Sequence, residues 1–192
     1  MKIYDITQEV FGGEVYPGDP MPAYQRVLSM EQGAVCNLTN FTMCAHNGTH
    51  LDAPFHFYKS GKTVEQLELS RCLGPCSVIE IPENYSEDEI INTLQTCQKR
   101  LLIKGKSIVT VELAKLFNRV GMRLIGVESQ SVGPTDSPMP VHLELLGQEV
   151  ILLEGLVLDE VPFGDYFLCA APVKLGGSDG APCRAILLDF VL

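Results

Sequence analysis

Three of the four histidines of this 192-residue chain lie within eleven residues, in the stretch His46-Asn47-Gly48-Thr49-His50-Leu51-Asp52-Ala53-Pro54-Phe55-His56. One aspartate, Asp52, lies between them. Neutral imidazole and carboxylate are good ligands for divalent ions such as Zn²⁺ and Mn²⁺. A chain with so few histidines that places three of them beside an aspartate is predicted to form a metal site there. The alternative is that these are unrelated histidines of a surface loop.

The spacing within the stretch indicates its local structure. His50, Asp52 and His56 are separated by even numbers of residues. Side chains two apart on an extended segment point the same way, so His50 and Asp52 can face one cavity, and His56 can face it too if the segment stays extended. Gly48 and Pro54 disfavour a regular helix. We therefore predict a strand end or an irregular loop, with His46 folded back toward His50.

A second pair of residues lies downstream. Glu154 follows the fourth histidine, His142, by twelve positions and ends the apolar run 150–154, which is typical of a buried strand. A carboxylate buried there needs a partner, because an unpaired buried charge costs several kcal/mol. Taken alone, Glu154 could also be an exposed strand end or form a salt bridge, and His142 could be a capping or surface residue.

The stretch from His46 to Phe57 resembles the His-x-Gly-Thr-His-x-Asp-x-Pro-x-His motif of the cyclase family, which includes the bacterial kynurenine formamidases. The resemblance extends over most of the chain. It includes Tyr4–Thr7, Tyr16–Asp19, Leu124–Glu128, Ser131-Val132 and Ala171–Pro182. The motif is long and specific. The family's fold, a swivelling β/β/α domain, is therefore expected here.

The resemblance also implies a set of metal ligands. His46, His50 and Asp52 match the ligands of a first ion, and Asp52 would bridge to a second. His142 matches a ligand of that second ion, and Glu154 a further carboxylate ligand shared between the two. The cofactor implied is thus a divalent metal, two ions per subunit, Zn²⁺ or Mn²⁺.

The same resemblance assigns two residues to the reaction. His56 matches the general acid/base, and Tyr16 stands where formamidases usually have a tryptophan that packs on the substrate's aromatic ring. We expect hydrolysis of a small amide or formamide, by water that the metal activates to hydroxide. N-formylkynurenine, giving kynurenine and formate, is the first candidate substrate. Thr49 is expected to shape the loop rather than act as a nucleophile.

Other positions depart from the family pattern. The segment between Gly105 and Thr110 is shorter than usual, and Glu128 and Gly133 stand where aspartate is common. The metal ligands are complete whereas the substrate-recognition elements differ. Two alternatives therefore stay open: a family member acting on a cyclic imide, lactam or lactone (or performing a cyclisation), and a catalytically silent metal-binding protein.

Composition limits the setting of this site. With 46% hydrophobic residues, 192 residues suffice for one core, so we expect a single domain over 1–192. A net charge of −10 disfavours nucleic acid and anionic membranes as partners. We see neither a signal-peptide stretch nor an apolar run of membrane-spanning length, which predicts a cytoplasmic location. Family members are commonly homodimers or homotetramers, so the expected partners are a small-molecule substrate and further copies of the chain.

Two further motifs have competing interpretations. The seven cysteines form no CxxC pair and are expected to be buried thiols. Cys72-x3-Cys76 could ligate zinc, but Gly74-Pro75 between them predicts a turn. The stretch Gly176–Gly180 lacks the ending of a phosphate loop and is expected to be a tight turn near the active site.

Hydrophobic patterning predicts more strands than helices, mixed along the chain. The fold class expected is α/β, with a mixed sheet or open barrel and outer helices. The expected strands are 2–7, 24–30, 38–44, 77–81, 101–104, 124–127, 150–153, 166–170 and 185–191. The expected helices are 64–70, 87–99, 111–120 and 141–146, with N-caps at Ser86 and Thr110.

Overall fold

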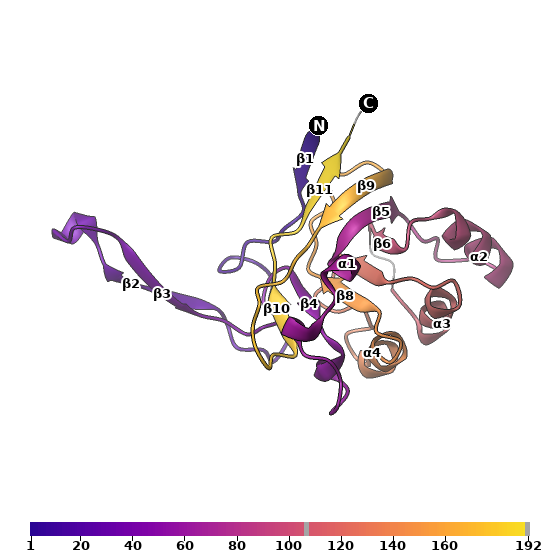
Figure 1. The fold of residues 1–192 in the computed structure, drawn as a ribbon, viewed down its shortest axis with the longest axis horizontal. Coiled ribbons are helices and arrows are strands. Elements are labelled where there is room, and N and C mark those ends of the chain that lie inside the picture. The colour runs from indigo at the N-terminus through magenta and orange to yellow at the C-terminus, as the bar shows by residue number, and fades with distance from the viewer. Residues whose placement is uncertain (106–107, 191–192) are drawn as a thin grey trace.

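The computed structural model describes residues 1–105 and 108–190. Within these residues, nine strands form one mixed sheet in the order β1-β11-β9-β5-β6-β7-β8-β4-β10 (Figure 1). The strands are β1 (Lys2–Asp5), β4 (His50–Asp52), β5 (Leu73–Ile79), β6 (Arg100–Ile103), β7 (Leu124–Val127), β8 (Ile151–Glu154), β9 (Gly164–Cys169), β10 (Gly180–Pro182) and β11 (Ile186–Asp189).

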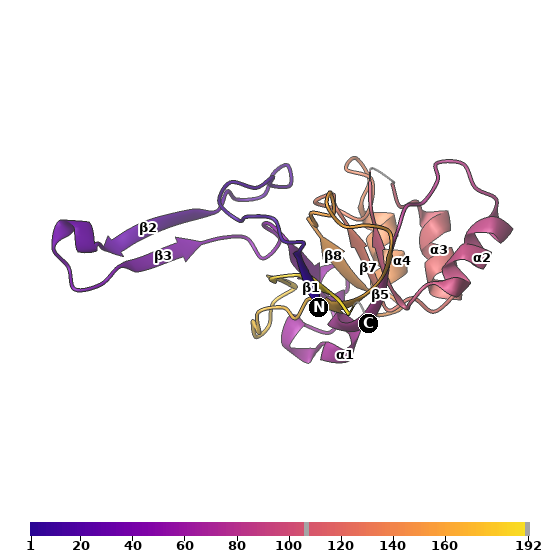
Figure 2. The ribbon, with the colours of Figure 1, turned by 90° about the horizontal axis from the view of Figure 1, so that it is seen from above.

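The centre of the sheet is parallel, from β5 through β6 and β7 to β8. Parallel neighbours need crossover connections, which are supplied by α2 (Glu87–Thr96), α3 (Val111–Arg119) and α4 (Met139–Leu146). Alternation along β6 divides the core: Leu101 and Ile103 pack with residues of these helices, whereas Leu102 packs on the opposite face. The helices therefore cover one face of the sheet (Figure 2).

The sheet curls without closing. β1 and β10 are its two edges, yet Thr7, two residues after β1, forms a bridge with Leu156, two residues after β8. Val157 N–H also donates to the carbonyl of Ile6, at 3.1 Å. Strands far apart in the sheet order are thus brought together, and the result is a half-barrel. The expected α/β class, a mixed sheet or open barrel with outer helices, is confirmed.

A long hairpin lies apart from this sheet. β2 (Ala23–Leu28) and β3 (Leu38–Thr42) pair only with each other, and a 3₁₀ turn, η1 (Met30–Gln32), lies between them. The hairpin projects away from the body of the molecule (Figures 1 and 2). Every residue of both strands is exposed. These strands were predicted, but their separation from the main sheet was not.

The helix expected over 64–70 is wrong as a single element. A 3₁₀ turn, η3 (Val64–Gln66), is followed by extended backbone at Leu67 and then by α1 (Leu69–Cys72). The N-caps predicted at Ser86 and Thr110 are confirmed, since each side chain accepts the backbone N–H three residues on. The last residue of the strand expected over 185–191, Val191, lies outside the described residues.

All seven cysteines fall within the described ranges and are free thiols. Cys72 ends α1 and Cys76 lies in β5. Burial raises the pKa of the Cys72 thiol to about 11 and that of Cys76 to about 12. Both are therefore protonated at neutral pH, which disfavours a zinc site between them.

The described helices are all short, the longest being the ten-residue α2. None combines the length and the hydropathy that crossing a bilayer would require.

Candidate metal centre

Strand β4 brings the middle of the histidine-rich stretch against β8. The two strands are antiparallel, and His50 lies directly opposite Glu154. Leu51 points into the core on the concave face of the sheet. Because side chains alternate along a strand, His50 and Asp52 point to the other face, together with Glu154. All three are buried. For Glu154, burial is what the apolar run that it ends predicted.

Helix α4 supplies the fourth residue. His142 is the fourth of its eight residues, and its ring contacts Asp52 and Glu154 from the helix-covered face of the sheet. The Nδ1 atom of His142 is 2.8 Å from the carbonyl oxygen of Pro138, and Nδ1 of His50 is 2.9 Å from that of Gly48. A carbonyl only accepts, so each Nδ1 carries the proton. Each Nε2 is then left facing the two carboxylates.

The spacing of these four side chains fits a bound ion. His50 Nε2 lies 3.5 Å from Asp52 Oδ1 and 3.3 Å from Glu154 Oε2. His142 Nε2 lies 3.6 Å from Asp52 Oδ2 and 3.4 Å from Glu154 Oε1. Donor atoms about 2.0–2.2 Å from a tetrahedral ion are roughly 3.4 Å apart, whereas hydrogen-bonded atoms are closer.

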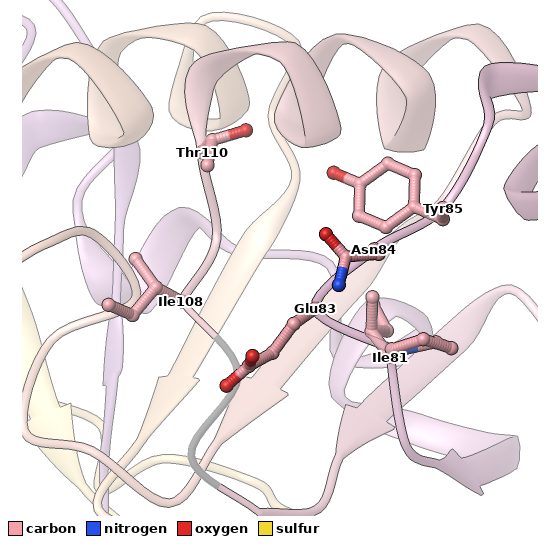
Figure 3. A pocket seen from close by; sticks show the side chains of 7 residues that line it. Ile81, Glu83, Asn84, Tyr85, Ile108 and Thr110 are labelled. Carbon is pink, nitrogen blue, oxygen red and sulfur yellow. The ribbon is translucent and has the colours of Figure 1, made fainter.

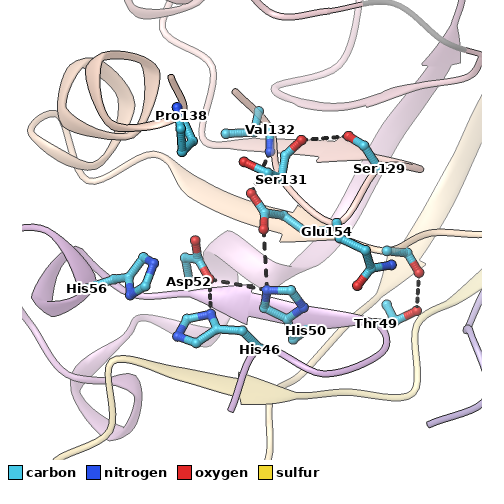
Figure 4. Close-up of polar contacts among 12 residues, drawn as sticks. His46, Thr49, His50, Asp52, His56, Ser129, Ser131, Val132, Pro138 and Glu154 are labelled. Atoms are coloured by element: carbon cyan, nitrogen blue, oxygen red, sulfur yellow. Dashed lines mark hydrogen bonds and ion pairs between the residues drawn. The ribbon is translucent and has the colours of Figure 1, made fainter. Parts of the chain in front are cut away.

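Two of these atoms also lack an ordinary partner. Within the described part of the chain, His50 Nε2 and Asp52 Oδ2 are buried without a hydrogen bond. The dashed lines that end on His50 in Figure 4 mark its longer ion-pair contacts with Asp52 and Glu154. Buried polar atoms are rarely left unsatisfied. The donor set therefore fits a divalent metal.

The charges of the site are strongly coupled. Burial opposes the charged form of His50, but the carboxylates of Asp52 and Glu154 outweigh it and raise the pKa of His50 to about 10. The same balance raises the pKa of His142 to about 10. Burial disfavours the charge of Asp52, but the neighbouring histidines hold its pKa well below the usual value. Without metal, two imidazolium groups thus balance two carboxylates.

The other two histidines of the stretch lie beside this group. His46 Nδ1 is 2.8 Å from Asp52 Oδ1, and the rings of His46 and His56 are 4.2 Å apart. His56 ends a 3₁₀ turn, η2 (Pro54–His56), and its side chain is 27% exposed. Two three-residue groups have donor atoms close enough to hold an ion: His46, Asp52 and His56, and His50, Asp52 and Glu154. They share Asp52.

Asp179 is a site residue that sequence reasoning missed. Its Oδ2 atom is 3.0 Å from His46 Nε2 and 3.0 Å from His56 Nδ1. Burial tends to raise the pKa of this carboxyl, but its contacts with both histidines lower it. The stretch Gly176–Gly180 was expected to be a turn near the active site, and a carboxylate in that turn was the available signal.

The loop before β4 is held by Thr49. Its hydroxyl donates to the carbonyl of Gly155 and accepts the N–H of Gln8. Gly155 has a left-handed φ of 67°, and a Cβ there would lie 2.6 Å from the carbonyl oxygen of Gly48. Thr49 thus ties the loop to the end of β8, which is the structural role expected for it.

A cavity of about 150 Å³ opens beside the histidines. It is lined by His46, His56, His142, Glu154 and Tyr16, among others. The hydroxyl of Tyr16 donates to the carbonyl of Thr135 at 3.1 Å. The structure therefore places all six predicted metal and catalytic residues together, with Tyr16 at the same cavity.

Two larger pockets lie at the carboxyl ends of the parallel strands. One, of about 460 Å³, is lined by residues 81–85 with Ile108 and Thr110 and contains one acidic side chain, Glu83, and no histidine or cysteine (Figure 3). The other, of about 730 Å³, shares Ser131 with the histidine cavity and is also lined by Gly105 and Ile108. Residues 106 and 107 of the shortened segment lie outside the described residues.

Comparison with known proteins agrees with this geometry. The Cyclase family model matches residues 4–134, which include the whole histidine-rich stretch. The chain belongs to the cyclase family. Two curated relatives of this cyclase-family chain are kynurenine formamidases. The one from Bacillus anthracis is 34% identical over 97% of both chains, and the one from Geobacillus thermodenitrificans (strain NG80-2) is 37% identical over 90% of both.

Solved structures share the fold of this cyclase-family chain. One described as a potential metal-dependent hydrolase with cyclase activity superposes with a TM-score of 0.80 at 29% identity, covering 97% of this chain and 96% of the other. Isatin hydrolase A from Labrenzia aggregata has the same TM-score at 21% identity, covering 97% of this chain and 93% of its own. At that identity the second likeness shows the fold alone.

Proposed function

We propose that this cyclase-family protein is a metal-dependent hydrolase of a small amide or formamide, with N-formylkynurenine as the first candidate substrate. The observation that carries the proposal is the buried group of His50, Asp52, His142 and Glu154, in which each imidazole lies at ligand spacing from both carboxylates. The kynurenine formamidase relatives supply the candidate substrate.

Two ions, Zn²⁺ or Mn²⁺, would be held at neighbouring positions that share Asp52. His46 and His50 would serve the first and His142 the second, with Glu154 shared between the two. The support is that Asp52 and Glu154 each contact both His50 and His142 through different carboxylate oxygens. Imidazole and carboxylate donors suit either metal. A bound divalent ion polarises an amide carbonyl and lowers the pKa of water, which are the two demands of amide hydrolysis.

The chain's own residues would supply the proton transfers. His56 lies at the open side of the cavity, partly exposed, where a leaving nitrogen could reach it. Its Nδ1 faces Asp179, so Nε2 is the atom that would take a proton from water or deliver one to the departing amine. The hydrophobic neighbours Tyr16 and Phe57 would hold an aromatic amide beside it.

A second candidate reaction is the opening of a cyclic imide, lactam or lactone. The shortened segment after Gly105 and the 730 Å³ pocket next to Ser131 favour it, because together they leave more room beside the histidines than a narrow formamide pocket would. Both reactions need the same metal ligands and the same proton donor, so substrate screening separates them.

The test is the hydrolysis rate of N-formylkynurenine by protein reloaded with Zn²⁺ or Mn²⁺ and by a chelated control. A metal-dependent kcat/KM above about 10⁴ M⁻¹s⁻¹, within the usual range of enzymes, is the expected result. Turnover of cyclic imides or lactones instead would favour the second candidate. Bound metal with no turnover of any acyl substrate would indicate a silent metal-binding protein.

We also propose a homodimer or homotetramer. The support is the hairpin, on which large apolar side chains such as Tyr24 and Phe41 are 59% and 57% exposed and Val35, between its strands, is 96% exposed. Exposed apolar groups gathered on one projection are typical of a surface that a partner covers. A cytoplasmic location, and the lack of nucleic-acid or membrane partners, stay predictions.

A further inference from the structure

One carboxylate oxygen contacts two histidines of the site from outside the group of metal ligands. Asp179 Oδ2 is 3.0 Å from both His46 Nε2 and His56 Nδ1. The two rings lie almost one above the other, with centroids 4.2 Å apart and planes inclined by 34°. One acceptor atom therefore sets the position of both rings.

The backbone holds this carboxylate in place. Ala53 N–H donates to the carbonyl of Asp179 at 2.8 Å, and Val64 N–H donates to that of Ser178 at 2.9 Å. Ala53 begins the turn that carries His56. The next residue, Gly180, lies opposite Asp52 in the β10–β4 pair. The loop bearing Asp179 is thus fastened to the histidine-rich stretch through Ala53 and Asp52, and to the turn that follows this stretch through Val64.

Gly180 shows how closely the loop approaches the site. A Cβ at this position would lie 2.6 Å from Cε1 of the His46 ring, and such a contact forces something to move. The backbone beside Asp179 therefore packs on the ring of His46, whose Nε2–H donates to the Asp179 carboxylate. The backbone beside the contact is thus fixed, while the Asp179 side chain itself is 41% exposed.

The contacts determine where the protons lie on each ring. An ionised carboxylate can only accept, so the nitrogen facing it carries a proton. For His56 the proton is on Nδ1, facing Asp179, and Nε2 is free for proton transfer. Both nitrogens of His46 face carboxylates, Nε2 that of Asp179 and Nδ1 that of Asp52, so Nδ1 would give up its proton to bind an ion while Asp179 keeps the proton on Nε2.

We propose that Asp179 is a positioning residue that fixes the tautomer and orientation of His56 and of His46, so that one side chain supports proton transfer and metal binding together. Its effect on catalysis rests on the proposed function, whereas its effects on the rings and on metal affinity do not. Partners of this kind typically change metal affinity or activity by about 10- to 100-fold.

The experiment compares Asp179→Ala and Asp179→Asn with the control Ser178→Ala. Ser178 lies in the same loop and donates to the carbonyl of Gly180, away from both histidines. Long-range ¹H–¹⁵N spectra of the four histidines in Zn²⁺-loaded protein report the tautomers directly. We expect His56 as the Nδ1–H form in the wild type and in S178A, and a mixture of tautomers in D179A. D179N keeps an acceptor oxygen, so its population of the Nδ1–H form of His56 should lie between those of the wild type and D179A.

Two further measurements use the same variants. Competition with a chromophoric chelator should show Zn²⁺ affinity about 10- to 100-fold weaker in D179A, with S178A unchanged. For N-formylkynurenine, D179A should lower kcat by a similar factor with little change in KM. Added to His56→Ala, D179A should cause no further loss of kcat, while the loss of Zn²⁺ affinity persists.

The outcomes separate this proposal from the proposed function. An unchanged His56 tautomer together with unchanged Zn²⁺ affinity in D179A would overturn it, as would kcat losses that multiply in the double variant. If the wild type does not hydrolyse N-formylkynurenine, the proposed substrate is wrong, but the spectra and the Zn²⁺ titration still decide the role of Asp179. If D179A does not fold, D179N provides the same comparisons.

Discussion

Two stretches that follow each other in the chain, the hairpin of β2 and β3 and the histidine-rich stretch 46–56, show opposite uses of a strand. In the hairpin every strand residue is exposed, including Tyr24 and Phe41. In β4 all three residues are buried, although two of them are a histidine and an aspartate. The polar side chains of His50 and Asp52 are therefore buried, whereas the large apolar side chains of the hairpin are exposed.

The difference is explained by what each strand pairs with. β4 has a neighbour on both sides, β8 and β10, and its polar atoms meet partners of opposite charge. Such burial is tolerated only when charges are paired or bind a metal. The hairpin has only itself, and an isolated two-stranded hairpin is marginally stable. We propose that an ion completes the buried stretch and that another copy of the chain covers the exposed one.

The largest expected effect comes from removing the carboxylate at the centre of the buried stretch. Asp52→Ala should lose both metal and activity, because this side chain lies beside His46, His50 and His142. We expect metal affinity to fall by more than about 100-fold, beyond the usual effect of groups outside the ligand shell. Metal content and kcat/KM measure this, with oligomeric state unchanged as the control. Full metal content in D52A would contradict the proposed site.

His56→Ala should separate chemistry from metal binding. We expect bound metal to be retained while kcat falls by about 10²- to 10⁴-fold, the usual contribution of general acid/base catalysis. Phe55→Leu, in the same turn but outside the lining of the cavity, is the matched control for packing. If H56A instead loses metal, His56 is a ligand, as its place in a group with His46 and Asp52 would allow.

Zn²⁺ affinity at the buried site should depend on pH, whereas self-association through the hairpin should not. His50 and His142 have a pKa of about 10 without metal, and each must lose its proton to bind an ion. Below that pH, Zn²⁺ affinity should therefore rise by up to about tenfold per pH unit for each histidine that gives up a proton. Titrations from pH 6 to 8 measure the slope, and affinity that does not change with pH would contradict the paired arrangement.

The raised pKa values of His50 and His142 also determine how the stability of the chelated, metal-free protein changes with pH. Histidine has a pKa near 6.5 when unfolded, so the folded state binds these protons more tightly. Their contribution to stability is full below about pH 6.5 and is lost as the pH rises through about 10. Thermal unfolding at pH 7 and pH 10 should show a lower Tm at the higher pH for chelated protein.

The smallest effect is expected at the hairpin. Phe41→Ser should weaken self-association by at least about tenfold, because burying a large apolar side chain contributes about 1.5–3 kcal/mol. Sedimentation at several protein concentrations measures this. Asn40→Ser, on the opposite face of β3, is the control, and metal content should stay unchanged in both. Unaltered association in F41S would show that the hairpin is not the interface.

Local signals predicted much of this molecule. The even spacing of His50 and Asp52 placed them on one face, and the apolar run ending at Glu154 placed that residue on a buried strand. The caps at Ser86 and Thr110 marked helix starts correctly. The helix expected over 64–70 failed because Leu67 turns extended between two short helical pieces, and local hydrophobicity carries no sign of that break.

Asp179 shows where such signals end. It contacts His46 across 133 positions of sequence and His56 across 123. No spacing rule spans that distance, and an aspartate between glycines is also what an ordinary turn contains. The contact exists because β10 pairs with β4, which was not predicted, since three residues are too few to show a period.

Residue types and short-range spacing thus determined the ligand chemistry available to this protein, because three histidines and an aspartate within eleven residues offer good donors for a metal. Tertiary structure alone decided which carboxylate contacts His56, and that one hairpin stands free of the sheet. The physical reason is the range of the interactions. Ligand chemistry belongs to single side chains, whereas strand pairing joins segments far apart in the chain and depends on the whole fold.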